Sequence, residues 1–405
     1  MAVGAPPTLE LPPVAGFRAA ATACGVKKGE ILDLMLVEMD SDTRAAGTFT
    51  KNRVCAAPVI LCRDRLPEGR AGALLVNAGN ANACTGPKGM LDALANSKCV
   101  ADSLNISDNA VFISSTGVVG EPLPVDKING AIPGLVEALA PGNWQAAAEA
   151  IMTTDTFAKT ATRNCTIEGQ TVTLVGMAKG SGMIHPNMAT MLSYIFTDAA
   201  IESEALQALL TRATELSFNC ITVDGDSSTN DTLMLFASGQ AGEEWMRDAA
   251  DPRLADFSRA LNELAIELAQ WVVRDGEGAS KFVTIKVEQA RSEAEAKQVA
   301  MSVAQSSLVK TACAGSDPNW GRIHVAVGYS GVDVEEDLID IYLGDALIVE
   351  KGQRAASYRE EMGQAVMDRE EITITIQLGQ GSDEATVWTC DLTHGYITIN
   401  ADYRT

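Results

Sequence analysis

Apolar residues recur with a helical period in one long segment of the chain, and a capping motif marks the start of a second helix. Over residues 254–271 the apolar positions step by three and four, which gives one face of an amphipathic helix that ends near Asp275. Ser292 followed by Glu295 forms a capping box, in which each side chain satisfies a free backbone amide of the first turn. This pair predicts a second helix that runs to about Val309.

Strand-like segments dominate the last part of the chain. Residues 371–378 alternate apolar and polar side chains with the period of a half-buried strand. The other predicted elements of this part are strands at 282–287, 338–343 and 385–392 and a helix at 355–368. Glycine and proline separate helix-like and strand-like segments throughout, which favours an α+β fold class. We expect a first domain over residues 1–280 and a smaller C-terminal α+β domain over residues 281–405.

The charge of the chain excludes several classes of partner. Its 405 residues include 31 Lys and Arg against 53 Asp and Glu, a formal net charge of −22. Such a field repels phosphate backbones and anionic lipid headgroups, so we expect neither nucleic acid nor membrane as a partner. Hydrophobic residues make up 46% of the chain, as in an ordinary globular protein with a full core.

Cysteine and histidine usage indicates a cytoplasmic protein without a metal. The nine cysteines are odd in number and nowhere in C-x-x-C spacing, which favours reduced thiols over a disulfide framework. Only three histidines are present, at 185, 324 and 394, too few and too far apart to suggest a zinc site. The N-terminus lacks the basic start and apolar run of a signal peptide, and no apolar stretch is long enough to span a membrane.

One segment rich in glycine and serine, residues 178–190, carries a candidate nucleophile. Its end places Thr190 directly after the small residue Ala189. A threonine hydroxyl at such a junction can attack the preceding carbonyl, shift the acyl group from nitrogen to oxygen and, after hydrolysis, become a new N-terminal residue. Its α-amine, with an ordinary pKa of about 7.7–8.0, then serves as the base. The alternative is that Thr190 simply starts a strand over 190–196.

Two further segments rich in small polar residues, 113–120 and 223–231, do not show the pattern of a regular element. In the first, the Thr116 hydroxyl and the Gly117 N–H are neighbouring donors, as an oxyanion hole requires, although an ordinary turn has the same composition. In the second, Asp224 and Asp226 resemble a calcium loop that lacks the required glycine and glutamate, which favours a structured turn.

Two charged residues near these segments are candidate substrate contacts. Lys179 lies beside the glycine-rich bend and would pair with a substrate carboxylate, whereas Glu277 follows the first predicted helix and would face an ammonium group. For both residues the alternative is an ordinary solvated charge on the surface.

The run from Lys179 to Met191, KGSGMIHPNMATM, resembles the self-cleavage segment of the ornithine acetyltransferases, the bifunctional glutamate N-acetyltransferases of arginine biosynthesis. The resemblance covers the whole chain, with further matching motifs at 76–86, 115–117, 222–231, 310–311, 317–322 and 400–405. It implies a self-cleaving αββα sandwich with a smaller C-terminal domain. Cleavage between Ala189 and Thr190 would give chains 1–189 and 190–405, assembled as an α2β2 heterotetramer.

The resemblance also assigns roles to single residues. Thr190 is implied as the nucleophile and, through its new α-amine, as the base, with Thr116 and Gly117 as the oxyanion hole. The implied substrate contacts are Thr153, Lys179, Thr190, Glu277, Asn400 and Thr405. Thr154 is an alternative to Thr153, because the register of that motif can differ by one residue.

The implied reaction is a ping-pong transfer of the acetyl group from N2-acetyl-L-ornithine to L-glutamate, without cofactor or metal. Bifunctional members of the family also accept acetyl-CoA as an acetyl donor, whereas single-function members do not. The resemblance covers both groups of members. An aminopeptidase or amidase with water as the acceptor is the alternative enzyme. A non-catalytic amino-acid-binding regulator with an uncut chain is the alternative from another class.

Overall fold

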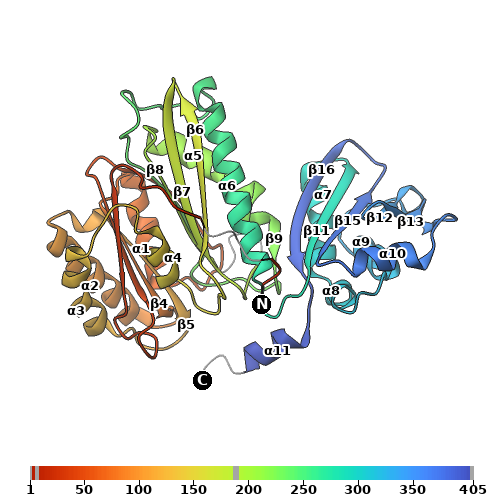
Figure 1. Ribbon diagram of the computed structural model, residues 1–405, viewed down its shortest axis with the longest axis horizontal. Coiled ribbons are helices and arrows are strands. Elements are labelled where there is room, and N and C mark those ends of the chain that lie inside the picture. The colour runs from red at the N-terminus through yellow and green to blue at the C-terminus, as the bar shows by residue number, and fades with distance from the viewer. Residues whose placement is uncertain (1, 5–8, 186–190, 402–405) are drawn as a thin grey trace.

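The computed structural model describes residues 2–4, 9–185 and 191–401. Two units follow one another along the chain, a larger one of four layers and a smaller C-terminal one (Figure 1). Within the described residues, no helix has the length and apolar character needed to cross a membrane.

The first two layers of the larger unit are a four-stranded sheet and the helices on its outer face. The sheet has the order β1-β2-β4-β5. Its strands are β1 (Phe17–Thr22), β2 (Leu34–Met39), β4 (Ala73–Asn80) and β5 (Val111–Val118), and its helices are α1 (Ala57–Arg65), α2 (Gly86–Leu104) and α3 (Val125–Glu137). Apolar side chains from this sheet and these helices form one continuous cluster.

The other two layers are a five-stranded sheet and two long helices. This sheet has the order β3-β10-β8-β7-β6. Its strands are β3 (Arg44–Phe49), β6 (Lys159–Ile167), β7 (Gln170–Lys179), β8 (Leu192–Thr197) and β10 (Thr232–Ala237), and α5 (Ser203–Leu216) and α6 (Ala255–Arg274) cover its outer face. Helix α6 agrees with the amphipathic helix that the periodicity predicts.

The inner faces of the two sheets pack on each other through aromatic side chains. Phe196 stacks on Trp144, the first residue of α4 (Trp144–Ala150), at 4.8 Å and on Phe236 at 5.6 Å between ring centroids. Phe112 of the first sheet meets Phe236 of the second edge to face at 6.1 Å. Such ring pairs stabilise a core beyond the area that they bury. The αββα sandwich that the family resemblance implies is thereby confirmed.

The second predicted helix is shorter than expected. Helix α7 (Glu293–Gln305) begins as predicted, because the Ser292 hydroxyl accepts the Glu295 amide at 3.2 Å. It ends at Gln305 rather than near Val309, because Ser306 has an extended backbone and its hydroxyl accepts the Val309 amide at 3.3 Å. A serine in this conformation caps a new helix, α8 (Ser307–Ala314), instead of continuing the old one.

The smaller unit is a seven-stranded sheet with α7, α8, α9 (Trp320–Gly328) and α10 (Glu360–Met367). The sheet order is β14-β13-β12-β15-β11-β16-β9, where the strands are β9 (Ile221–Thr222), β11 (Phe282–Ala290), β12 (Asp340–Leu343), β13 (Ala346–Glu350), β14 (Gln353–Arg354), β15 (Glu371–Gln377) and β16 (Asp383–Cys390). Strand β15 alternates buried and partly exposed side chains as predicted. The helix predicted over 355–368 is shorter in the structure, where α10 spans only Glu360–Met367.

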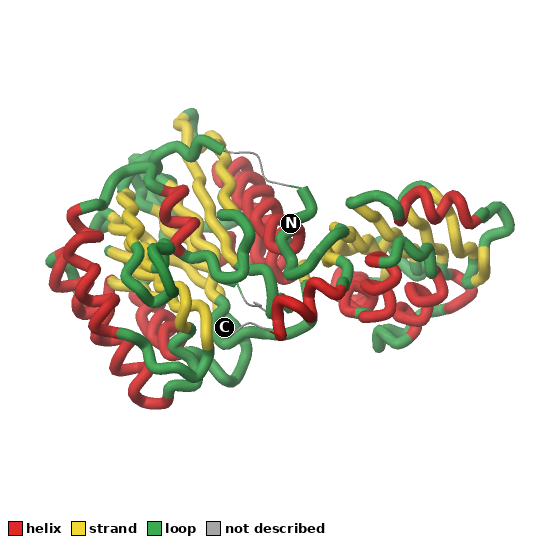
Figure 2. The backbone as a smooth tube through the Cα atoms, turned by 60° about the horizontal axis from the view of Figure 1, so that its bottom comes forward, coloured by secondary structure: helices red, strands yellow, loops and turns green. Residues whose placement is uncertain are grey.

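Two features connect the smaller unit to the larger one. Strand β9 belongs to a chain segment between α5 and β10, yet it pairs with β16 through Ile221 and Thr222. After β16, helix α11 (His394–Ala401) returns toward the four-layer unit, as both views show (Figure 1, Figure 2). Asn400 of α11 lines the same cavity as Gly117 of β5 and Lys179, the last residue of β7.

Candidate active site

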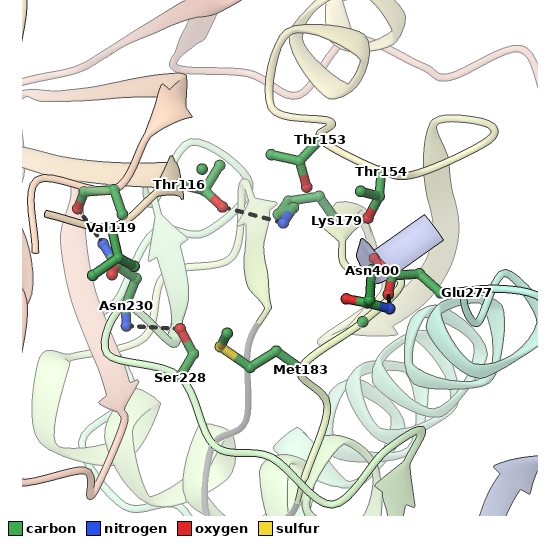
Figure 3. A pocket seen from close by; sticks show the side chains of 13 residues that line it. Thr116, Val119, Thr153, Thr154, Lys179, Met183, Ser228, Asn230, Glu277 and Asn400 are labelled. Carbon is green, nitrogen blue, oxygen red and sulfur yellow. Dashed lines mark hydrogen bonds between the residues drawn. The ribbon is translucent and has the colours of Figure 1, made fainter. Parts of the chain in front are cut away.

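One cavity collects most of the predicted site residues. Its lining includes Thr116, Gly117, Thr153, Thr154, Lys179, Glu277 and Asn400, together with Ser228 and Asn230 from the segment before β10 (Figure 3). The predicted residues Ala189, Thr190 and Thr405 lie outside the described residues. The cavity thus brings together segments that are far apart in the sequence.

Thr116 and Gly117 lie on a strand, although the sequence of residues 113–120 does not show a strand pattern. They are part of β5, which pairs in parallel with β4, with an irregular register at Gly79 and Asn80. Gly117 has a φ of +130°, and a Cβ there would lie 2.3 Å from the Gly79 carbonyl carbon. Only glycine permits this conformation and this close approach of the two strands.

Lys179 ends β7 with its side chain inside the protein, so its interpretation as a solvated surface charge is wrong. The residue is only 3% exposed, and its Nζ lies 3.1 Å from Thr116 Oγ1. Burial lowers the pKa of Lys179, an effect that the nearby carboxylates of Asp155, Asp231 and Glu277 oppose. An ammonium group has no acceptor, so it donates to the threonine oxygen and leaves the threonine hydrogen free for another partner.

Glu277 is also buried rather than solvated. It follows α6, is 7% exposed, and its Oε2 accepts a hydrogen bond from Asn400 Nδ2 of α11 at 2.7 Å. Gly182 packs directly on this carboxylate, since a Cβ on Gly182 would lie 2.3 Å from Glu277 Oε2. The carboxylate therefore faces the cavity from the side opposite Thr116 (Figure 3).

The chain on both sides of residues 186–190 is held by aspartates. Asp224 accepts the amides of Met183 at 2.6 Å and Ile184 at 2.9 Å, in addition to the amide of Asp226 within its own turn. Asp231 accepts the Met191 amide at 3.2 Å, and its burial raises the pKa of its carboxyl well above the usual range. The predicted turn at Asp224 is confirmed.

Sequence reasoning missed the anchoring roles of Asp224 and Asp231, and it missed Asn230 as a lining residue. The Asn230 amide donates to the carbonyls of Ala81, at 2.6 Å, and Ser115, at 2.8 Å, and so joins the segment before β10 to the first sheet. The sequence does contain a signal for these roles, because Asp, Ser and Asn are concentrated in residues 223–231, between two apolar segments.

The arrangement suits the binding of a small molecule with both a carboxylate and an ammonium group. The buried ammonium group of Lys179 and the buried carboxylate of Glu277 lie on different walls of the cavity. The Thr116 hydroxyl and the Gly117 N–H lie on the same side as Lys179. Among the described residues, no group of three or more His, Cys, Asp or Glu side chains is placed to hold a metal ion.

The family profile and the sequence relatives match nearly the full chain, and a solved structure matches half of it. The profile of the ArgJ family matches residues 18–405. The arginine biosynthesis bifunctional protein ArgJ of Neisseria meningitidis is 49% identical over 98% of this chain and 97% of its own length. That of Ruegeria pomeroyi is 48% identical over 97% of this chain and 96% of its own length. A crystal structure of the Bacillus halodurans protein of the same name is 40% identical and covers 50% of this chain and 95% of the solved chain, with a TM-score of 0.49.

Proposed function

This chain belongs to the ArgJ family, and on that premise we propose that it transfers the acetyl group of N2-acetyl-L-ornithine to L-glutamate. The observation that supports this most is the cavity in which the Lys179–Thr116 pair faces Glu277 and Asn400. Both substrates are α-amino acids, and ornithine adds an ammonium group that a buried carboxylate attracts. In this proposal Lys179 or the Thr153–Thr154 segment binds the shared carboxylate, and Thr405 completes the site.

In the first half-reaction, Thr190 Oγ attacks the acetyl carbonyl while the Thr190 α-amine takes the hydroxyl proton. The negative charge that develops on the carbonyl oxygen is stabilised by the Thr116 hydroxyl and the Gly117 N–H. Collapse of the tetrahedral intermediate breaks the amide bond. The ornithine nitrogen leaves with the proton from the Thr190 α-ammonium, and the acetyl group remains as an ester on Thr190.

In the second half-reaction, the amine of L-glutamate attacks this ester in the vacated site. The Thr190 α-amine accepts the proton that the attacking amine loses and returns it to Thr190 Oγ as the ester bond breaks. N-acetyl-L-glutamate leaves and the free threonine is restored. Acetyl-CoA would enter the same cycle as an alternative acetyl donor.

The mechanism needs a free α-amine at Thr190, so the proposal includes self-cleavage between Ala189 and Thr190. The products are chains 1–189 and 190–405, two of each in an α2β2 heterotetramer, with the catalytic domain within residues 1–280 and the smaller domain within 281–405. We place the protein in the cytoplasm, because its nine cysteines all are free thiols and such thiols persist in a reducing compartment.

The acceptor separates this proposal from an amidase of the same architecture. Purified protein with N2-acetyl-L-ornithine and L-glutamate should form N-acetyl-L-glutamate and ornithine in equal amounts, measured by chromatography and mass spectrometry. Release of free acetate without N-acetyl-L-glutamate would instead identify water as the acceptor. Binding of amino acids by an uncut chain without turnover would support the regulator.

Glu277→Gln should raise the KM for N2-acetyl-L-ornithine by about 10-fold to 100-fold, which corresponds to a charged hydrogen bond of about 1.5–3 kcal/mol. The glutamine keeps an acceptor for Asn400 but loses the charge that attracts the ornithine ammonium. Steady-state kinetics with each substrate varied in turn measure the effect, and the KM for L-glutamate should not rise. An unchanged KM for N2-acetyl-L-ornithine would show that Glu277 does not bind the ammonium group.

A further inference from the structure

Three charged side chains lie buried together behind the wall of the cavity. Lys159 Nζ is 2.6 Å from Asp155 Oδ1 and 2.7 Å from Asp275 Oδ2, and the three side chains are 0%, 0% and 1% exposed. We refer to Asp155, Lys159 and Asp275 as the buried charge cluster. Well-packed apolar residues of similar volume often stabilise a fold as well as a buried ion group does. Stability alone is therefore a weak explanation for this cluster.

Asp155 ties together two chain segments that line the cavity. Its Oδ2 accepts the amide of Thr153 at 2.9 Å, and its Oδ1 accepts the amide of Gly180 at 2.7 Å. Gly180 directly follows Lys179, and Thr153 is itself a lining residue. Asp155 therefore fixes the distance between the Thr153 wall and the Lys179 backbone.

Asp275 ties the same segments to the loop that carries Glu277. Its Oδ2 accepts the amide of Thr156 at 2.9 Å, and its carbonyl accepts the hydroxyl of Ser181 at 2.5 Å. Ser181 in turn accepts the Glu277 amide through its own carbonyl at 2.9 Å. The three segments 153–156, 179–181 and 275–277 are thus joined through the two carboxylates that Lys159 holds.

The cluster also has an unbalanced charge that faces Lys179. Two carboxylates and one ammonium leave a formal charge of −1, and of the carboxylates that act on the buried Lys179, Asp155 has the largest effect. The charged groups that act on Lys179 are Lys27, Asp155, Lys159, Asp231 and Glu277. An opposite charge at short range favours the ionised form of a buried amine.

We propose that the buried charge cluster is the positioning element of the substrate cavity: it sets the placement of Lys179 relative to Glu277 and supplies the negative charge that compensates the Lys179 ammonium. This inference rests on the proposed function, because Lys179 needs its charge to bind a substrate carboxylate. Asp155, Lys159 and Asp275 touch no substrate and act only through the lining residues.

Two substitutions in the full-length protein change the cluster charge in opposite directions. Asp155→Asn brings the formal charge to zero and should lower the pKa of Lys179, so the alkaline limb of kcat/KM for N2-acetyl-L-ornithine should move to lower pH by about one unit. Lys159→Met brings the charge to −2 and should move the same limb to higher pH. A merely structural role would lower activity in both variants without opposite shifts.

Lys281→Met is the matched control, because Lys281 is also a buried lysine, but its Nζ bonds to the carbonyls of Met367 and Arg369 at 2.9 Å each. Lys281→Met should leave the alkaline limb of kcat/KM at the same pH as in the wild type. Thr156→Ala is the variant to use if a cluster variant does not fold. Of the two hydrogen bonds from Thr156 to the Asp275 carboxylate, it removes the one from the hydroxyl and keeps the one from the main-chain amide. It should raise the KM by about threefold with kcat unchanged, as expected for one lost hydrogen bond.

Equal shifts in both cluster variants, or an alkaline limb that stays fixed in both, would overturn the inference. If neither cluster variant folds, an unchanged KM for N2-acetyl-L-ornithine in Thr156→Ala would overturn the inference. Failure of the proposed function would be recognised separately, because the wild-type protein itself would then form no N-acetyl-L-glutamate.

Discussion

Thr190→Ala is expected to remain a single chain of 405 residues and to transfer no acetyl group. The substitution removes the hydroxyl that attacks the Ala189 carbonyl, and it thereby prevents the formation of the α-amine that acts as base. Loss of both the nucleophile and its base should reduce turnover to below detection, since no other group of the proposed mechanism can form the acetyl ester.

Denaturing intact-mass spectra of the wild type and the variant measure the cleavage. The wild type should give two polypeptides, one that ends at Ala189 and one that begins at Thr190. Thr171→Ala, which changes an exposed threonine of β7, should be cut and active like the wild type. A folded wild type that stays uncut would remove the α-amine from the mechanism and favour the amino-acid-binding regulator.

Thr116→Val should lower kcat by about 10²-fold to 10³-fold, the usual effect of losing one oxyanion-hole donor. Valine has nearly the shape of threonine but no hydroxyl. The donor is needed mainly when charge has built up on the acetyl oxygen, so the KM should change much less than kcat. Steady-state rates of N-acetyl-L-glutamate formation provide the measurement.

A neighbouring hydroxyl on the same strand gives the control for this variant. Ser115 is buried and donates to Asn77 Oδ1 at 2.6 Å, outside the cavity lining. Ser115→Ala should therefore keep kcat near the wild-type value. If Thr116→Val instead raised the KM at constant kcat, Thr116 would be a ground-state contact and not an oxyanion donor.

The elements with a clear period were predictable from the sequence. Helix α6 and strand β15 each present one apolar face, and local spacing alone identifies them. Strand β5 was missed because its Ser114, Ser115 and Thr116 are polar and yet buried. Ser115 finds its partner in Asn77 and Thr116 finds its partner in Lys179, both distant along the chain, and no local pattern contains that information.

The family resemblance identified the candidate site, whereas residue-by-residue reasoning left each charge solvated by default. Lys179 is buried against a hydroxyl 63 positions away, and Glu277 is buried against an amide 123 positions away. The bond between Lys159 and Asp275 joins residues 116 positions apart. Isolated charges in a sequence are usually exposed, and only the fold shows which ones acquire partners.

The strand order of the five-stranded sheet has a consequence for the proposed cleavage. Chain 1–189 would contribute β3, β6 and β7, and chain 190–405 would contribute β8 and β10, which lie between them. The severed chains would therefore stay together through main-chain hydrogen bonds along two strand boundaries. Complete unfolding would then also be a dissociation, so by mass action the mature protein should melt at a higher temperature as its concentration increases, unlike its uncut precursor.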